Sequence, residues 1–76
     1  MTPSQCRAAR AIIGISQGEL STISDVAKRT IASFENETRA PYDRTIKAIR
    51  EALESSGVDF IDENGGGAGV RLRKNG

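Results

Sequence analysis

The stretch QGELSTISDVAKRTIASFE, residues 17–35, contains two short helical patterns separated by only a few residues. The first pattern opens with a capping box, in which the Ser16 hydroxyl and the Glu19 carboxylate serve the first free backbone N–H groups of a helix. Its apolar positions are Leu20 and Ile23. The sequence therefore predicts a short helix that begins at the start of this stretch.

A tight turn and a second short helix follow. Asp25 is among the few side chains that tolerate a left-handed backbone, so we expect the first helix to end there. The second helix covers roughly residues 28–35, with Ile31 and Phe34 spaced for burial on one side. Ala27 stands at its N-cap without a side-chain oxygen, a loss of about 1 kcal/mol. The pattern is typical of two helices that cross at a large angle.

Two further helices flank this pair. The segment Thr2-Pro3-Ser4-Gln5 combines a capping box with a proline at the first helical position, and Gly14 supplies the left-handed residue that ends a helix. After a polar loop that contains Pro41, a fourth helix is predicted over about residues 43–56, followed by Gly57. Its apolar stripe consists of Ile46, Ile49 and Leu53.

Beyond this glycine the apolar period changes from 3.6 to 2, which predicts two half-buried strands. Val58 and Phe60 belong to the first strand, and Val70 and Leu72 to the second. For all four side chains to share one face, the numbers of paired residues must sum to an even value. A three-residue loop at residues 64–66 meets this condition, whereas a two-residue turn does not. The same strands are also able to pair with a second copy of the chain.

Composition excludes several classes of function. The 76 residues include no histidine and one cysteine, so there is no internal disulfide and no usual zinc ligand set. The absence of histidine also removes the commonest general base. The carboxylates form no recognisable acid–base pair, and Cys6 is expected to be a half-buried apolar residue. We therefore expect no enzymatic activity, no metal and no cofactor.

The formal net charge of +1 is the sum of opposed blocks. Residues 1–50 carry eight basic and five acidic side chains, and residues 51–64 carry five acidic side chains and no basic one. The tail restores three positive charges, at Arg71, Arg73 and Lys74. The near-zero net charge therefore hides a basic region and an acidic region, and the charge of each region says more about binding partners than the total does.

The longest uncharged stretch, residues 11–18, is far shorter than the ~20 apolar residues of a membrane span. The first residues also lack the basic and apolar regions of a signal peptide. We expect a cytoplasmic, nucleoid-associated protein with no membrane partner.

Three groups of residues resemble the XRE family, the phage repressor and Cro-type helix-turn-helix proteins, over about residues 4–57. They are Ser16-Gln17-x-Glu19-Leu20, Val26-x-x-x-Thr30-Ile31-x-x-Phe34-Glu35-Asn36, and Arg39-x-Pro41 followed by Thr45-Ile46. The resemblance implies a mainly α fold. Residues 1–57 are expected to form a four-helix lambda-repressor-like DNA-binding domain. Residues 58–76 replace the usual fifth helix with a β-hairpin or a dimer-forming strand segment that has a Gly-rich turn.

The same resemblance assigns roles to individual residues. It implies that bases are read by Lys28, Arg29, Ala32 and Ser33. It implies that phosphates are contacted by Gln17, Asn36, Arg39 and Arg44. Arg10 and Glu35 are expected to form a structural pair beneath the DNA face. The acidic block is expected to face away from DNA, and the basic tail to discourage edge-to-edge aggregation or to contact phosphate.

Together these features predict a bacterial or phage-type transcription regulator, a repressor that binds double-stranded DNA as a homodimer on a palindromic operator. Four short helices do not cover all the apolar side chains of the C-terminal segment, so the dimer interface is expected at Val58, Phe60, Val70 and Leu72. One alternative stays open. An antitoxin-type interaction module that binds a partner protein through its C-terminal strands would also explain the uncapped second helix of the motif and the small charge excess.

Overall fold

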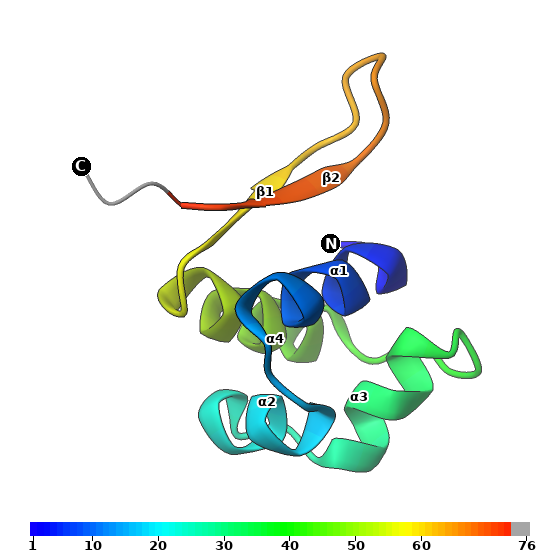
Figure 1. Cartoon of the computed structure of the whole chain (residues 1–76). Coiled ribbons are helices and arrows are strands. Elements are labelled where there is room, and N and C mark those ends of the chain that lie inside the picture. The colour runs from blue at the N-terminus through cyan, green and yellow to red at the C-terminus, as the bar shows by residue number, and fades with distance from the viewer. Residues whose placement is uncertain (74–76) are drawn as a thin grey trace.

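The computed structural model describes residues 1–73, so Lys74 of the basic tail lies outside the described residues. The described chain is mainly helical and ends in a hairpin (Figure 1). Its elements are α1 (Pro3–Ile13), α2 (Gln17–Ser24), α3 (Lys28–Glu35), α4 (Asp43–Ser55), β1 (Val58–Ile61) and β2 (Gly69–Leu72). The fold class and the order of elements expected from the sequence are confirmed.

Local capping fixes the helix boundaries where the sequence predicts them. The Thr2 hydroxyl accepts from the Gln5 backbone N–H at 3.1 Å, and the Gln5 side chain accepts from the Thr2 N–H at 2.8 Å. Ser16 and Glu19 form the equivalent box at the start of α2. Gly14 ends α1 in the left-handed conformation, with φ of 74°. These local hydrogen bonds keep the connections between helices short.

The core lies where the four helices and β1 meet. Its fully or nearly fully buried apolar residues are Cys6, Ala9, Leu20, Ile31, Phe34, Ile49, Leu53 and Val58. Of the two apolar positions of α2, Leu20 is buried in the core, whereas the Ile23 side chain is 51% exposed. Ile23 lies over a shallow depression with Ala48 and Ala52 of α4, whose small side chains do not reach far enough to cover it.

The hairpin closes within one chain and in the predicted parity. β1 and β2 are antiparallel, with Val58 opposite Leu72 and Phe60 opposite Val70. The connection is longer than the expected three-residue loop, since pairing stops at Ile61 and Gly69. The residues between them are carboxylates and glycines for the most part, which contribute few cross-strand contacts.

The hairpin packs on α1 and α4 (Figure 1). Val58 is completely buried in the core of its own chain, so its predicted place in a dimer interface is wrong. Phe60 and Val70 are half-buried against the same core, and Arg50 of α4 lies over the Phe60 ring, 5.1 Å from its centroid. Only Leu72 of the four predicted interface residues is largely exposed, at 59%.

Gln5 attaches the hairpin to α1. Its side-chain Nε2 donates to the carbonyl oxygens of Ile61 and Gly69, at 3.2 and 3.0 Å. These residues form the last strand pair before the loop. Gln5 is only 5% exposed, and its Oε1 is used in the capping box of α1. The buried Gln5 amide thus caps the N-terminus of α1 and also holds the hairpin against this helix.

The substitution Gln5→Ala should destabilise the protein by about 2 kcal/mol, because it removes three partly buried hydrogen bonds at once. Urea denaturation followed by circular dichroism measures the loss. Hydrogen exchange should become faster in β1 and β2 than in α4, since the hairpin loses its attachment to α1. The exposed Ser4→Ala serves as the matched control in the same helix turn. Equal exchange rates in the hairpin with and without Gln5 would contradict this role.

Candidate nucleic-acid interface

The turn between α2 and α3 determines how α3 stands on the molecule. Asp25 takes the left-handed conformation, with φ of 58°, which any non-glycine residue except a few polar ones would resist. The Ser21 hydroxyl donates to the Val26 carbonyl at 2.6 Å, and the Val26 N–H donates back to the Ser24 hydroxyl at 3.3 Å. These hydrogen bonds from small polar side chains stabilise a short turn and hold the two helices at a fixed angle.

α3 has one buried and one accessible side. Ile31 and Phe34 are buried in the core, whereas Lys28 and Arg29 are exposed in the first turn. One turn further along, Ala32 and Ser33 are half-buried. The four residues implied to read bases thus lie on the part of α3 that the core leaves accessible. The N-cap, Ala27, makes no side-chain hydrogen bond, so the N-terminal turn of α3 has no side-chain cap.

The C-terminal end of α3 is held by a buried carboxylate. Glu35 is 1% exposed and receives two hydrogen bonds from Arg10 of α1, Nε to Oε2 at 2.7 Å and Nη2 to Oε1 at 2.6 Å. The Gln17 amide donates to Oε1 at 3.0 Å, and the Cys6 thiol donates to Oε2 at 3.1 Å. Arg7 donates to the Glu35 backbone carbonyl. The Arg10–Glu35 pair expected from the resemblance is present and joins α1 to α3, and the Gln17 hydrogen bond adds α2.

The pKa values of this cluster follow from burial and hydrogen bonding. Burial alone raises the pKa of the Glu35 carboxyl, but hydrogen bonds from Arg10, Gln17 and Cys6 outweigh it and hold the pKa below its ordinary value. Burial, followed by the hydrogen bond to Glu35, raises the pKa of the Cys6 thiol to about 12. Cys6 therefore stays protonated and acts as a buried donor. The expectation that it is a half-buried apolar residue missed this polar role.

The residues implied to contact phosphate surround α3. Gln17 is the first residue of α2 and is half-buried, whereas Asn36 is the exposed C-cap of α3. Arg39 is exposed in the loop before α4 and lines a small depression together with Arg29 and Ser33. Arg44, in the first turn of α4, lies over the ring of Tyr42, 5.2 Å from its centroid; both side chains are exposed. Polar and cationic groups therefore stand on both sides of the accessible face of α3.

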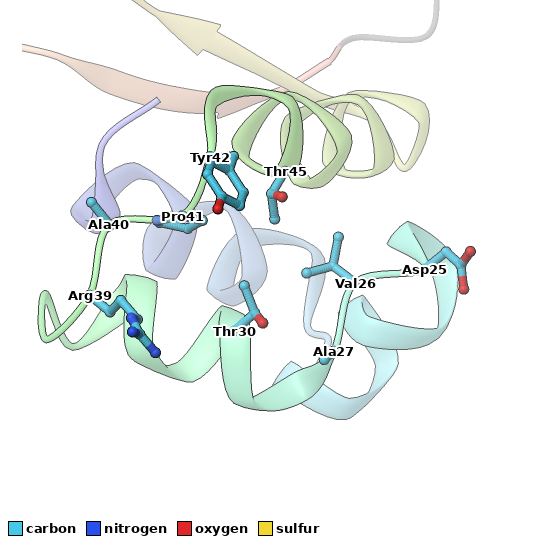
Figure 2. Close-up of a pocket in the computed structure, with 9 residues that line it drawn as sticks. All are labelled: Asp25, Val26, Ala27, Thr30, Arg39, Ala40, Pro41, Tyr42 and Thr45. Carbon is cyan, nitrogen blue, oxygen red and sulfur yellow. The ribbon is translucent and has the colours of Figure 1, made fainter.

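A larger open cavity of about 650 Å³ lies between α3 and the start of α4 (Figure 2). Figure 2 shows Tyr42 and Thr45 on one side of the cavity and Thr30 and Val26 on the other. The sequence does not reveal this cavity, because its lining comes from two separate stretches of the chain, residues 25–30 and 39–45. Tyr42 is 74% exposed, so an aromatic ring beside α3 is open to solvent.

The cationic side chains of α3 and the acidic block lie in different layers of the molecule. In Figure 1, α2 and α3 form one layer, α1 and α4 the next, and the hairpin lies on the far side of α1 and α4. The acidic block begins in the second half of α4 and continues through β1 into the loop of the hairpin. Most of its carboxylates therefore stand away from the exposed side of α3.

The described residues hold neither a metal-binding cluster nor a membrane-spanning helix. No group of three His, Cys, Asp or Glu side chains in residues 1–73 is placed to hold a metal ion. No helix within this part of the chain has the length and apolar character needed to cross a membrane.

The substitution Arg10→Met should cost about 3–5 kcal/mol at pH 7, because it leaves the buried Glu35 carboxylate without its cation. In the native protein the Glu35 pKa is lowered, so its stabilising contribution is present above the unfolded pKa of about 4.3 and is lost as the pH falls further. In the variant, protonation of Glu35 removes the unpaired charge. The difference in unfolding free energy between the native protein and Arg10→Met should therefore become smaller as the pH falls.

Urea denaturation at pH 7 and pH 4 measures both effects, and Glu54→Gln provides a control, since it breaks a far less buried ion pair with Arg50. The control should lose no more than about 1 kcal/mol. If the loss of unfolding free energy in Arg10→Met is the same at pH 7 and pH 4, the lost charge pairing with Glu35 is not the cause of that loss.

Comparison with known proteins agrees with this geometry. A family model described as Helix-turn-helix matches residues 7–60, from α1 to β1. A search of curated proteins found no match to the chain. The matched region includes the α2–α3 pair, the Arg10–Glu35 ion pair and the cationic residues around α3. The chain therefore belongs to the XRE-type helix-turn-helix family of DNA-binding transcription regulators.

Proposed function

We propose that this chain is a sequence-specific repressor that acts as a homodimer on a palindromic operator, with α3 in the major groove. The observation that carries the proposal is the two-sided character of α3. Its inner side is fixed by Ile31, Phe34 and the Glu35 cluster, and its outer side presents Lys28 and Arg29 to solvent. A major groove about 12 Å wide admits one α-helix presented in this way.

Base reading is assigned to the accessible positions of α3. The Arg29 guanidinium suits a bidentate contact with guanine O6 and N7, and Lys28 provides a second donor to the same atoms. Each good bidentate contact is worth about 1–3 kcal/mol of discrimination. The Ala32 methyl suits apolar contact with a thymine methyl, and the Ser33 hydroxyl donates to or accepts from a base edge. These side chains cover two successive turns of the helix.

Phosphate contacts are assigned to Gln17, Asn36, Arg39 and Arg44. Gln17 stands at the N-terminus of α2, where free backbone N–H groups and the helix dipole favour an anion. Its amide is oriented by Glu35, so the ion pair that fixes α3 also fixes this neighbouring contact. Arg39 supplies a cation from the opposite side of α3. Contacts on both sides of the helix would set its register in the groove.

A homodimer is part of the proposal because one copy is small. The longest dimension of the described chain is 33 Å, so one copy spans no more than about one turn of B-DNA, ~34 Å. Two copies related by a two-fold axis would read half-sites about one turn apart. The low net charge supports the same conclusion, since few cations remain for nonspecific attraction.

The matched pair Arg29→Ala and Arg39→Ala tests these assignments. Arg29→Ala should reduce affinity for the cognate site about 5- to 150-fold, corresponding to the loss of about 1–3 kcal/mol, with a smaller loss on unrelated DNA. Arg39→Ala should weaken binding to both about equally and reduce the slope of log K against log salt by about 1. Cognate DNA for the assay comes from selection out of a random duplex pool.

Binding is measured by fluorescence anisotropy at several salt concentrations. Equal losses on cognate and unrelated DNA for Arg29→Ala would show that Arg29 contacts phosphate and not a base edge. A selected consensus without two-fold symmetry would contradict the palindromic operator. Failure to select any DNA sequence from the pool would overturn the proposed sequence-specific function as a whole.

A further inference from the structure

We propose that Asn64, in the loop between β1 and β2, is a site of spontaneous covalent modification. Its side-chain amide is lost as ammonia, and aspartate or isoaspartate takes its place. The proposed DNA-binding function assigns no role to this loop, so the inference stands independently of it. The reaction needs no enzyme and no cofactor, because the reacting groups are Asn64, the backbone of Gly65 and water.

The reaction joins the Gly65 backbone nitrogen to the side-chain carbon of Asn64. The nitrogen loses its proton to hydroxide and attacks the Asn64 Cγ, which closes a five-membered succinimide ring. The Cγ–Nδ2 bond breaks, and Nδ2 takes up a proton and leaves as ammonia. Water then opens the ring. Cleavage between Cγ and the nitrogen gives aspartate, and cleavage between the backbone carbonyl carbon and the nitrogen gives isoaspartate. One water enters and one ammonia leaves in total.

Both reacting residues are exposed and lie outside the strand ladder. Pairing of β1 with β2 stops at Ile61 and Gly69, so ladder hydrogen bonds do not restrain residues 64 and 65. Within residues 1–73 the Gly65 N–H makes no hydrogen bond. Hydroxide therefore reaches this N–H without any prior opening of the structure.

The absence of a side chain at residue 65 removes the steric barrier to ring closure. The Gly65 φ is 98°, a conformation that glycine adopts at little cost. A Cβ built on this residue would meet nothing within 4 Å, so no other part of the protein crowds the backbone here. The Gly65 nitrogen is thus free to approach the Asn64 Cγ as the backbone of the loop rotates.

Asn36, the C-cap of α3, provides an internal comparison. The nitrogen that would attack its side chain belongs to Glu37, and this N–H donates to the Phe34 carbonyl at 3.1 Å. The Asn36 N–H itself donates to the Ala32 carbonyl at 2.9 Å. Ring closure at Asn36 therefore requires local unfolding at the end of α3, and Glu37 also has a side chain that hinders the attack. The structure thus favours reaction at Asn64.

The modification changes the charge of the chain. It adds one carboxylate directly after Asp62 and Glu63, so the formal net charge falls from +1 to zero. A net charge near zero promotes self-association of a small domain, and the loss of net positive charge weakens nonspecific attraction to DNA. Older copies of the protein should therefore differ from newly made copies in charge, although their fold is the same.

The fold tolerates the modification because the site lies away from the core. Figure 1 shows the loop projecting from the hairpin, away from the four helices. Isoaspartate adds one methylene to the main chain, but it does so in a segment without strand pairing. The hydrogen bonds from Gln5 to the Ile61 and Gly69 carbonyls lie outside this segment. We therefore expect an unchanged urea midpoint for the modified protein.

Incubation of the intact protein in heavy-oxygen water at pH 7 and pH 9, followed by trypsin digestion and mass spectrometry, tests the inference. Asn64 lies in the tryptic peptide of residues 51–71 and Asn36 in that of residues 30–39, each with one asparagine and no glutamine. The Asn64 peptide should exchange its amide for one heavy oxygen at least about 10-fold faster than the Asn36 peptide, because only Asn36 needs local opening. The rate should rise at pH 9, since hydroxide removes the proton from the attacking nitrogen.

Two variants serve as matched controls. Asn64→Gln keeps an amide but requires a six-membered ring, so the peptide of residues 51–71 should take up almost no heavy oxygen. Gly66→Ala leaves the reacting pair intact and adds a methyl group where nothing lies within 4 Å, so its rate should equal that of the unsubstituted protein. A methyltransferase specific for isoaspartate should label the incubated protein and leave incubated Asn64→Gln unlabelled.

Equal rates in the Asn64 and Asn36 peptides would overturn the inference, as would an Asn64 amide that is retained at both pH values. Guanidinium chloride gives a second measurement, because it unfolds the chain and breaks the hydrogen bond from Glu37 to Phe34. The Asn36 rate should then rise while the Asn64 rate changes little. A large rise at Asn64 on unfolding would show that the folded loop protects this residue, and would also overturn the inference.

Discussion

The buried contact between Arg10 and Glu35 is the interaction on which the geometry of the motif depends. A carboxylate that is 1% exposed costs several kcal/mol unless its oxygen atoms are satisfied. Here they accept from Arg10, Gln17 and Cys6. Because these donors come from α1 and α2, the carboxylate at the end of α3 is stable in only one arrangement of three helices. The exposed side of α3 is presented at a fixed angle as a result.

α1 connects this cluster to the other end of the molecule. Its second half contributes Arg10 to Glu35, and its first turn contributes Gln5 to the hairpin carbonyls. The hairpin and α3 therefore lie on opposite sides of the same rigid helix.

Several features could be predicted because they depend on neighbours in sequence. The capping boxes at Thr2 and Ser16 and the left-handed Asp25 use residues within a few positions of each other. The parity of the strand pairing followed from alternation alone, since a slip of one residue would expose every apolar side chain of the hairpin. The exposure of Ile23 could not be predicted, because its spacing from Leu20 indicates a helix side but not whether α4 has side chains large enough to cover it.

The sequence by itself thus determined the helix ends, the α2–α3 turn, the parity of the hairpin and the cationic outer side of α3, all of which are set by short-range hydrogen bonds and side-chain period. Only the tertiary structure decided that the Val58 side chain belongs to the core, that the Cys6 thiol donates to Glu35 and that Gln5 fixes the hairpin. Those roles join residues 29 to 64 positions apart, or depend on which elements cover a surface. Local pattern carries no information about them, because burial and long-range hydrogen bonds exist only after the elements have packed.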